Sequence, residues 1–313
     1  MKAISFDTIT GLNISPYTCY EWVSDAIAHK ADAVLPAKTS LKPGIEGVFY
    51  NTMPVLIPPK VGGVKEVTRY PKRVPSLDSQ ILLYDLQTGQ DLALLDGNWI
   101  TAMRTGAVAA HSIKLLANPD FSTLGFIGLG NTARAALLVL LALYPDRPMT
   151  VKLKKYKDQH ESFAERFKEY ANVTFLYCDE YEDVVRESDV VVSAATVFET
   201  DICSDDCFKE GVLVVPIHTR GFTNCDLFFD KVFADDVNHV KGFRYFSQFK
   251  SFAEVADVVS GQKPGRENSR ERILAYNIGI ALHDIYFASK IYEMCGENCP
   301  EVNLNPPTAK FWV

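Results

Sequence analysis

The stretch "TLGFIGLGNTARAALLVLLALY" (residues 123–144) decides the fold of this chain. Its first part predicts a buried strand and its second part, from residue 131 onward, predicts an apolar helix. Between them Gly128, Gly130 and Ala133 form a G-x-G-x-x-A turn. The first glycine permits a tight bend, the second lets the backbone approach a pyrophosphate, and the alanine allows close packing of the helix. We therefore expect dinucleotide phosphates at the helix N-terminus, and the alternative is a purely structural glycine turn.

Further strands and helices alternate after this turn. Apolar runs without polar alternation predict strands at residues 149–156, 173–179, 189–196, 211–219 and 231–236, and the spacing of aromatic residues predicts a helix over 158–171. Strands of this kind, separated by helices, are typical of a parallel sheet that is covered on both faces. The pattern predicts a Rossmann-type, doubly wound α/β domain.

The remaining parts of the chain have a different pattern. Helices are expected within 16–34, over 98–117 and over 270–294, and strands within 46–58, 63–71 and 79–97, the last a hairpin that turns at Thr88-Gly89. We expect residues 1–119 plus 278–313 to form a smaller α+β domain for substrate binding and dimerisation. The dinucleotide-binding domain, residues 120–277, would be inserted into it.

The amino-acid composition of the chain limits the kinds of molecule that it can bind. The 313 residues carry a net charge of −7 and are 47% hydrophobic, which argues against a nucleic-acid binder. The longest apolar run, Ala135 to Tyr144, is about half of what a membrane span needs, and the N-terminus has no secretory pattern, so a cytoplasmic protein is expected. Seven cysteines are an odd number, and the pairs Cys203/Cys207 and Cys295/Cys299 lack zinc-site spacing, so no metal is expected.

The second strand of the predicted sheet bears on the choice of cofactor. An acidic residue near its end binds the ribose of NAD, whereas basic residues accept the phosphate of NADP. Here the chain reads "KLKKYKD" (152–158), with Lys154 and Lys155 before any acid. NADP(H) is therefore favoured. NAD(H) remains possible if Asp158 reaches the site, and a solvated lysine face is the alternative without a ligand.

Three charged or titratable residues stand out from apolar surroundings. Lys65 and Arg104 lie among apolar and small residues, where a charge needs a partner or a ligand; taken alone, each is as well explained by a surface position or a salt bridge. His218 follows "GVLVVPI", at the carboxyl end of a predicted parallel strand, where open α/β sheets bind ligands. The alternative is a hydrogen-bonded structural histidine.

The segments "MPVLIP", "GVKEVT", "NWITAMRTGAVAAH", "GFIGLGNTARA", "SAAT" and "IGIALHD" occur in the order and spacing of the ornithine cyclodeaminase and mu-crystallin family, which the chain resembles from about residue 36 to 292. The resemblance implies a homodimer with an inserted Rossmann domain. It also implies that NAD(H) or NADP(H) acts on a small amino acid, imino acid or cyclic ketimine that carries a carboxylate.

The resemblance also implies roles for individual residues. Lys65 matches a lysine that contacts the substrate near the reacting carbon, Arg104 an arginine that binds the substrate carboxylate, and Met53 a methionine of the substrate pocket. Contacts to the cofactor are implied for the turn and its surroundings: Gly128, Gly130, Asn131, Thr132 (where the family usually has glutamine), Ala133, Thr196 and Gly279.

Four further positions depart from the family. Lys38 replaces a second carboxylate-binding arginine, and Asn51 replaces the glutamate that holds the distal amine of ornithine. His283 replaces a glutamate next to the retained Asp284, and His218 stands where cyclodeaminases have an aspartate. Histidine exchanges a proton near neutral pH.

The departures bear on the reaction. They favour an NAD(P)-dependent oxidoreductase that reduces an imine or oxidises an amino acid, with Lys65 and His218 as the catalytic pair. The alternatives are an ornithine cyclodeaminase-like lyase and a non-catalytic NADP(H)-binding protein.

Overall fold

The computed structural model describes residues 1–218, 222 and 226–311. They form two compact units. Unit 1 comprises Met1–Asn13, Asp32–Ile100 and Asp284–Val313, and unit 2 comprises Ile14–Ala31 and Thr101–His283. These boundaries differ from those expected from the sequence, since residues 14–31, 101–119 and 278–283 group with the parallel sheet. The reason is packing, because a helix belongs to the unit on which its apolar face is buried.

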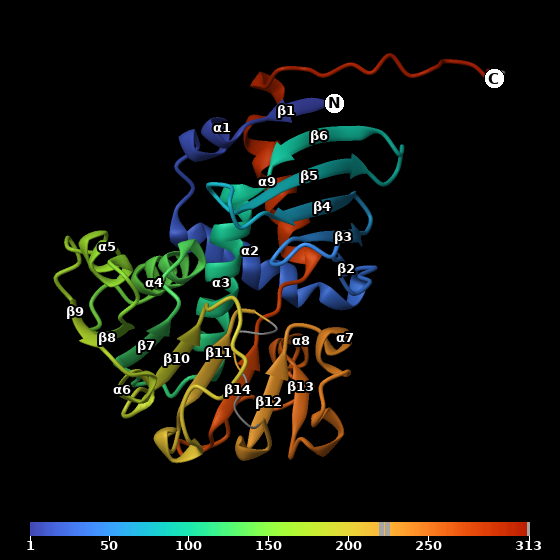
Figure 1. Ribbon diagram of the computed structural model, residues 1–313. Helices are drawn as coiled ribbons and strands as arrows, with labels where there is room; N and C mark the ends of the chain where they lie inside the picture. Colours follow the sequence, from blue (N-terminus) through green and yellow to red (C-terminus); the bar gives the residue numbers. More distant parts are fainter. Residues whose placement is uncertain (219–221, 223–225, 312–313) are drawn as a thin grey trace. The chain divides into compact units, whose positions relative to one another are not determined.

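Unit 2 is built around an eight-stranded sheet (Figure 1). Its strands, all parallel, are β7 Thr123–Ile127, β8 Met149–Lys154, β9 Val173–Cys178, β10 Val190–Ser193, β11 Leu213–Pro216, β12 Lys231–Ala234, β13 Phe252–Glu254 and β14 Ile273–Tyr276. They lie in the order β13-β12-β14-β11-β10-β7-β8-β9. The chain leaves β7 toward β8 and β9 on one side and returns to β10 on the other, so the doubly wound fold expected from the sequence is confirmed.

One element was wrongly predicted. The helix expected over 270–294 begins only at Ala281, and Ile273–Tyr276 is instead strand β14, inserted between β11 and β12. All four residues of β14 are buried. A short apolar run buried on both faces has no periodicity that separates a strand from a helix, so the sequence pattern alone could not make this distinction.

The helices of unit 2 are α2 Pro16–Ala28, α4 Asn131–Leu143, α5 Gln159–Glu165, α6 Tyr181–Val185, α7 Val237–Val240, α8 Val255–Val259 and most of α3 Asn98–Leu116. Helix α5 is shorter than the predicted 158–171, although Phe163 and Phe167 are both buried as expected. Helix α3 packs tightly on α4, because a Cβ on Gly106 would lie 2.5 Å from the Cβ of Ala135. A bulkier residue at position 106 would force the two helices apart.

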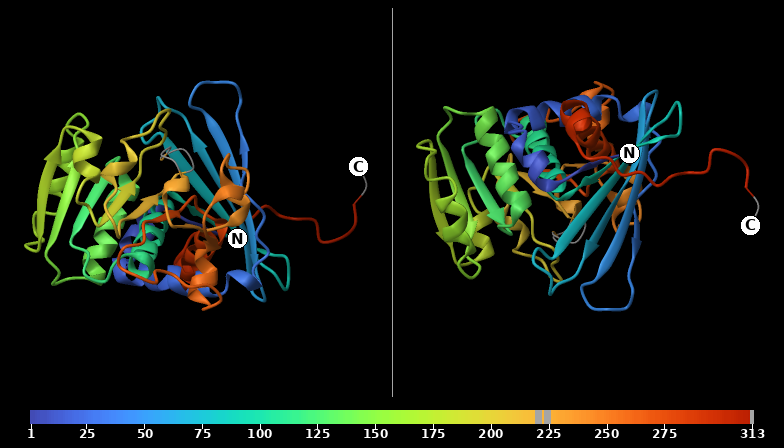
Figure 2. Two further views of the ribbon diagram at one scale, coloured as in Figure 1. Left: turned by 90° about the horizontal axis from the view of Figure 1, so that it is seen from below. Right: turned by 90° about the horizontal axis from the view of Figure 1, so that it is seen from above.

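Unit 1 contains a six-stranded sheet in the order β1-β6-β5-β4-β3-β2. Its strands are β1 Lys2–Ile4, β2 Thr39–Leu41, β3 Phe49–Ile57, β4 Val61–Arg69, β5 Leu77–Asp85 and β6 Asp91–Asp96; the long strands β3 to β5 run side by side in Figure 2. All neighbours are antiparallel except β1 and β6, and the predicted hairpin turn has Gly89 at φ +72°. The unit also contains α1 Phe6–Gly11 and most of α9 Ala281–Cys295.

Helix α9 packs against β4 in unit 1. A Cβ on Gly63 would lie 2.7 Å from Cδ1 of Ile285, so this glycine allows the helix to approach the sheet closely.

No helix in the described ranges is both long and apolar enough to cross a bilayer.

Candidate functional site

The predicted glycine turn lies directly beyond β7. Gly128 has φ +79°, and a Cβ there would lie 2.6 Å from the carbonyl carbon of Ala194 and the nitrogen of Ala195, in the segment that follows β10. Only glycine fits this approach. By contrast, a Cβ on Gly130 would meet no atom within 4 Å, and Ala133 is fully buried. The turn is therefore closed toward the sheet and open at the position where a pyrophosphate would approach.

Helix α4 begins immediately after this turn. Gly130 occupies its N-cap position, so no side chain caps the first backbone N–H groups. Asn131 is exposed and Thr132 is half-buried in the first helical turn. Uncapped N–H groups at the start of a 13-residue helix attract an anion, and the residues present therefore fit a dinucleotide phosphate.

The other predicted residues of unit 2 follow neighbouring strands of the same sheet. Because all strands are parallel, their carboxyl ends meet at one edge. In spatial order this edge carries Lys154 and Lys155 at the end of β8, the glycine turn after β7, Thr196 after β10, His218 after β11 and Gly279 after β14. Ligands of open α/β sheets bind in the crevice at this edge, where the strand order reverses.

Two lysines mark the end of β8. The Nζ of Lys155 lies 3.0 Å from Oδ1 of Asp179, and the Nζ of Lys154 lies 4.9 Å from the centre of the Tyr181 ring. Asp158 lies four residues beyond the end of the strand, at the start of α5. The end of β8 is therefore basic, as expected from the sequence.

Arg104 lies on α3 and is buried, with only 5% of its surface exposed. Its guanidinium lies against Gly279, where a Cβ would be only 2.8 Å from Nη1 and 3.3 Å from Nη2. Gly279 has φ +94°, a conformation that glycine adopts without strain. The missing side chain of Gly279 thus leaves room for the guanidinium at the carboxyl edge of the parallel sheet.

Unit 1 brings three predicted substrate residues onto neighbouring strands and a fourth, Lys38, just before another strand of the same sheet. Met53 on β3 pairs directly with Lys65 on β4, and both are buried. Asn51 lies two residues before Met53, so both side chains project from the same face of the sheet. Lys38 directly precedes β2, whose first residue, Thr39, pairs with Thr52 on β3. The described register therefore places Met53 opposite Lys65 and leaves Lys38 just before the neighbouring strand.

Lys65 forms a buried ion pair. Its Nζ lies 2.7 Å from Oδ1 of Asp284 on α9, and the two side chains are 1% and 0% exposed. The salt bridge that the sequence left open as an alternative is therefore present. An ion pair of this kind is compatible with a catalytic role, because a lysine ammonium has three N–H donors in all.

Comparisons with known proteins agree with this architecture. Residues 24–298 match the ornithine cyclodeaminase/mu-crystallin family, which accounts for most of the chain. The chain belongs to this family.

Individual relatives are similar over most of their length. The nodulation efficiency protein NfeD of Rhizobium meliloti is 27% identical over 271 residues, or 83% of each chain. A Delta(1)-pyrroline-2-carboxylate reductase of Bacillus cereus is 28% identical over 74% of this chain and 76% of its own. The structure of the Thermococcus litoralis Delta(1)-pyrroline-2-carboxylate reductase with NADH and L-proline superimposes with a TM-score of 0.84 at 25% identity, covering 96% of this chain and all of that one.

His218 is one of the positions at which the sequence resemblance predicts a departure of this family member from the cyclodeaminases. It is half-buried, and the backbone before it is held by hydrogen bonds from Ile217 N to Ser193 O and from Asn277 N to Pro216 O, each 2.8 Å. The residues directly after it, 219–221, lie outside the described part of the chain. A catalytic role for His218 stays a prediction.

The cysteine pairs of this family member are buried thiols. Burial and the neighbouring Cys207 raise the pKa of Cys203, and burial and the neighbouring Cys299 raise the pKa of Cys295 to about 11. Both changes disfavour the thiolate that a metal requires. In the part of the chain that the structure describes, no three His, Cys, Asp or Glu residues come together as metal ligands.

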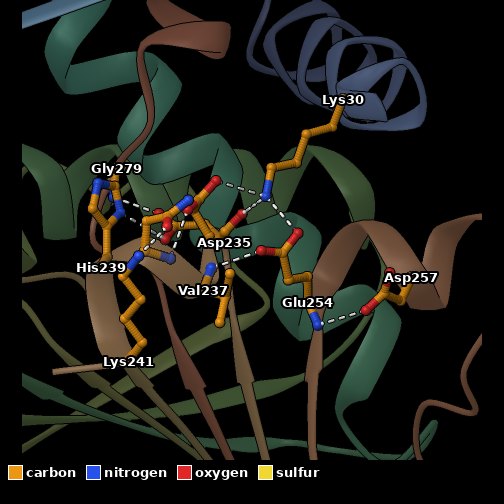
Figure 3. A network of polar contacts seen from close by, with 10 residues as sticks. Lys30, Asp235, Val237, His239, Lys241, Glu254, Asp257 and Gly279 are labelled. Carbon is orange, nitrogen blue, oxygen red and sulfur yellow. Dashed lines mark hydrogen bonds and ion pairs between the residues drawn. The ribbon is translucent and has the colours of Figure 1, made fainter. Parts of the chain in front are cut away.

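A polar network at the ends of β12 and β13 was missed by the sequence analysis (Figure 3). The Nζ of Lys30 donates to the carbonyl of Asp235 at 2.7 Å and to Oε2 of Glu254 at 2.6 Å, and it lies 3.0 Å from Oδ2 of Asp236. A signal was present in the sequence, since two aspartates end the predicted strand "KVFADD" at the carboxyl edge of the sheet.

Proposed function

We propose that this chain is an NAD(P)-dependent reductase of a small imino acid, or a dehydrogenase of the corresponding amino acid. The observation that carries the proposal is the buried guanidinium of Arg104 at the carboxyl edge of the sheet that also bears the dinucleotide turn. A buried arginine suits a carboxylate ligand, because its planar fork binds both carboxylate oxygens. The turn and the arginine together favour a redox reaction on a carboxylate-bearing substrate.

The reaction reduces a C=N bond. The imine and a proton combine with a hydride equivalent to give the amine, and NAD(P)H is oxidised to NAD(P)⁺. When bound, a reduced nicotinamide supplies this hydride, and the protein supplies orientation and charge. Arg104 binds the substrate carboxylate, Lys65 donates a hydrogen bond to the nitrogen as it becomes an amine, and His218 transfers the proton.

A cyclic imino acid is the substrate class to test first. The Bacillus cereus and Thermococcus litoralis relatives are Delta(1)-pyrroline-2-carboxylate reductases, and the latter was crystallised with L-proline. Ornithine suits this chain less well, because the neutral amide of Asn51 pairs poorly with an ammonium group. A histidine in place of the aspartate also offsets the charge of an iminium less than a carboxylate would, which argues against deaminating cyclisation.

NADP(H) is the proposed cofactor in preference to NAD(H). Lys154 and Lys155 at the end of β8 support it, because a phosphate on the ribose would gain charge-assisted hydrogen bonds there. The Thermococcus litoralis relative binds NADH, so both cofactors belong in the test.

The test is spectrophotometric. NADPH and NADH oxidation would be followed with Delta(1)-pyrroline-2-carboxylate, with its six-membered homologue, and with 2-oxo acids plus amines. We expect turnover of a cyclic imino acid, and we expect this turnover to depend on the carboxylate group of the compound. Tight cofactor binding without turnover of any of these compounds would contradict the proposal and favour a non-catalytic NADP(H)-binding protein.

The proposal includes a homodimer, as the family resemblance implies. Light scattering on the purified protein would measure a mass near twice 34.9 kDa if this is correct. A single monomeric species at all concentrations would contradict it.

A further inference from the structure

We infer that Asp235 is a positioning residue for Arg104, acting through the backbone of Gly279. This inference rests on the proposed function, because it gives Arg104 the task of binding the substrate carboxylate. All three residues belong to unit 2.

Asp235 is held in place at the end of β12. It is only 2% exposed, and its backbone N–H donates to the carbonyl of Tyr276 at 3.1 Å. Its own carbonyl accepts the hydrogen bond from Lys30 at 2.7 Å. The backbone of Asp235 is therefore fixed from both sides, toward β14 and toward the end of α2, and its carboxylate has little freedom to move.

The carboxylate of Asp235 fixes Gly279 in turn. Its Oδ2 accepts a short hydrogen bond from the N–H of Gly279, and Figure 3 shows the two residues facing each other. Without this acceptor the N–H of Gly279, buried at a φ of +94°, would lose its partner. A hydrogen bond that a backbone N–H donates to a carboxylate is of the strong, charge-assisted kind.

Gly279 then determines where the guanidinium of Arg104 can lie. A Cβ at Gly279 would fall 2.8 Å from Nη1, so the guanidinium rests directly on this peptide segment. The segment is also tied to α3, which carries Arg104, because Ser112 Oγ donates to Oδ1 of Asn277 at 3.0 Å. A shift of Gly279 would consequently move the surface on which the guanidinium rests.

His239 also lies beside the carboxylate of Asp235. Its Nδ1 lies 3.5 Å from Oδ1 of Asp235, and its side chain is 6% exposed. Oδ1 thus faces the imidazole while Oδ2 faces Gly279, so each carboxylate oxygen has its own neighbour. This orients the carboxylate plane toward the Gly279 N–H.

Asp235→Ala and Asp235→Asn test the inference in the full-length protein. We expect Asp235→Ala to raise KM for the imino acid by about 10-fold or more with kcat changed by less than about 3-fold, since a misplaced Arg104 weakens ground-state and transition-state binding alike. Asp235→Asn keeps an oxygen acceptor for the Gly279 N–H and should restore KM to within about 3-fold of wild type.

Asp236→Ala is the matched control. Asp236 is the next residue, is also buried, and pairs with Lys30 and caps α7, but it makes no contact with Gly279 that the structure describes. It should lower stability without raising KM. If Asp236→Ala raises KM as much as Asp235→Ala, or if Asp235→Asn is as defective as Asp235→Ala, the inference is wrong.

Gly279→Ala provides a second test if Asp235→Ala fails to fold. Its Cβ would displace Nη1 of Arg104 directly and should raise KM by about 10-fold or more. Gly261→Ala is its control, because Gly261 also has a positive φ of +73° but no atom lies within 4 Å of the added Cβ. An unchanged KM in Gly279→Ala would overturn the inference.

Crystal structures of the same variants separate this inference from the proposed function. We expect the guanidinium of Arg104 to shift in Asp235→Ala and to keep its place in Asp235→Asn. If the wild-type protein turns over no imino acid, the proposed function fails, and the position of Arg104 alone decides whether Asp235 positions it. An unmoved guanidinium in Asp235→Ala would contradict the inference whatever the activity.

Discussion

The Nζ of Lys65 lies 2.7 Å from Oδ1 of Asp284, and both side chains are almost completely buried. A buried ion pair has two possible functions in this chain. It can hold α9 on the sheet of unit 1, or it can hold Lys65 ready for a substrate. Replacing one partner tests the first function, because it leaves a buried charge without its counter-ion, and replacing both partners removes that cost.

Lys65→Met should therefore destabilise the protein by about 3–5 kcal/mol, whereas Lys65→Met combined with Asp284→Leu should recover most of this loss. Urea unfolding measures both changes. Activity should be lost in the single and the double variant alike if Lys65 contacts the substrate, and NADPH binding should persist. A stable double variant that retains wild-type turnover would show that the pair is structural.

His218→Ala should lower kcat/KM by about 10²–10⁴-fold, the usual contribution of a general acid or base. The dissociation constant of the cofactor should stay within about 3-fold, because the glycine turn is untouched. His160→Ala is a suitable control, since His160 lies on α5 with its ring 5.0 Å from that of Tyr177, away from the residues assigned to catalysis. Unchanged turnover in His218→Ala would leave this residue with a structural role only.

Replacing Lys154 and Lys155 together by alanine should weaken NADPH binding by about 10-fold or more and change NADH binding by less than about 3-fold, because only NADPH carries the phosphate that these cations would bind. Fluorescence titration of both cofactors measures the difference. Lys152→Ala is the control, since the Nζ of Lys152 donates to the backbone carbonyls of Asp183 and Arg186 instead. An equal loss for both cofactors would contradict the preference for NADP(H).

His111 should make the protein sensitive to mild acid. Burial on α3, with a smaller contribution from Lys114, lowers its pKa to about 4, whereas an unfolded chain has a histidine pKa of about 6.5. Below about pH 6.5 the unfolded state binds a proton that the folded state does not. The free energy of unfolding is therefore not reduced by His111 above this pH. It falls as the pH drops toward 4, by about 2 kcal/mol at pH 5.

His111→Gln should remove this part of the pH dependence. Urea unfolding at pH 7 and pH 5 would show a smaller difference in the variant than in the wild type, by about 2 kcal/mol. Equal differences in the two proteins would show that other groups are responsible for the acid sensitivity.

Elements with a local signal could be predicted from the sequence. The turn at Gly128 and Gly130 was predicted because steric requirements within a few residues specify glycine, and the apolar helix after it was predicted from its composition. Most parallel strands were likewise visible as short apolar runs. These strands also predict that His218 and the lysines of β8 lie at one edge of the sheet, since parallel strands end on the same side.

Contacts between distant residues became visible only in the folded chain. Lys65 and Asp284 are 219 positions apart, and no local pattern assigns an ion-pair partner across that distance. The pattern over 270–294 predicts a helix where the structure has strand β14, because burial on both faces removes the periodicity that identifies a strand. The contact of Asp235 with Gly279 could not be predicted either, because any residue type can supply the backbone N–H of such a hydrogen bond. Packing determines both features.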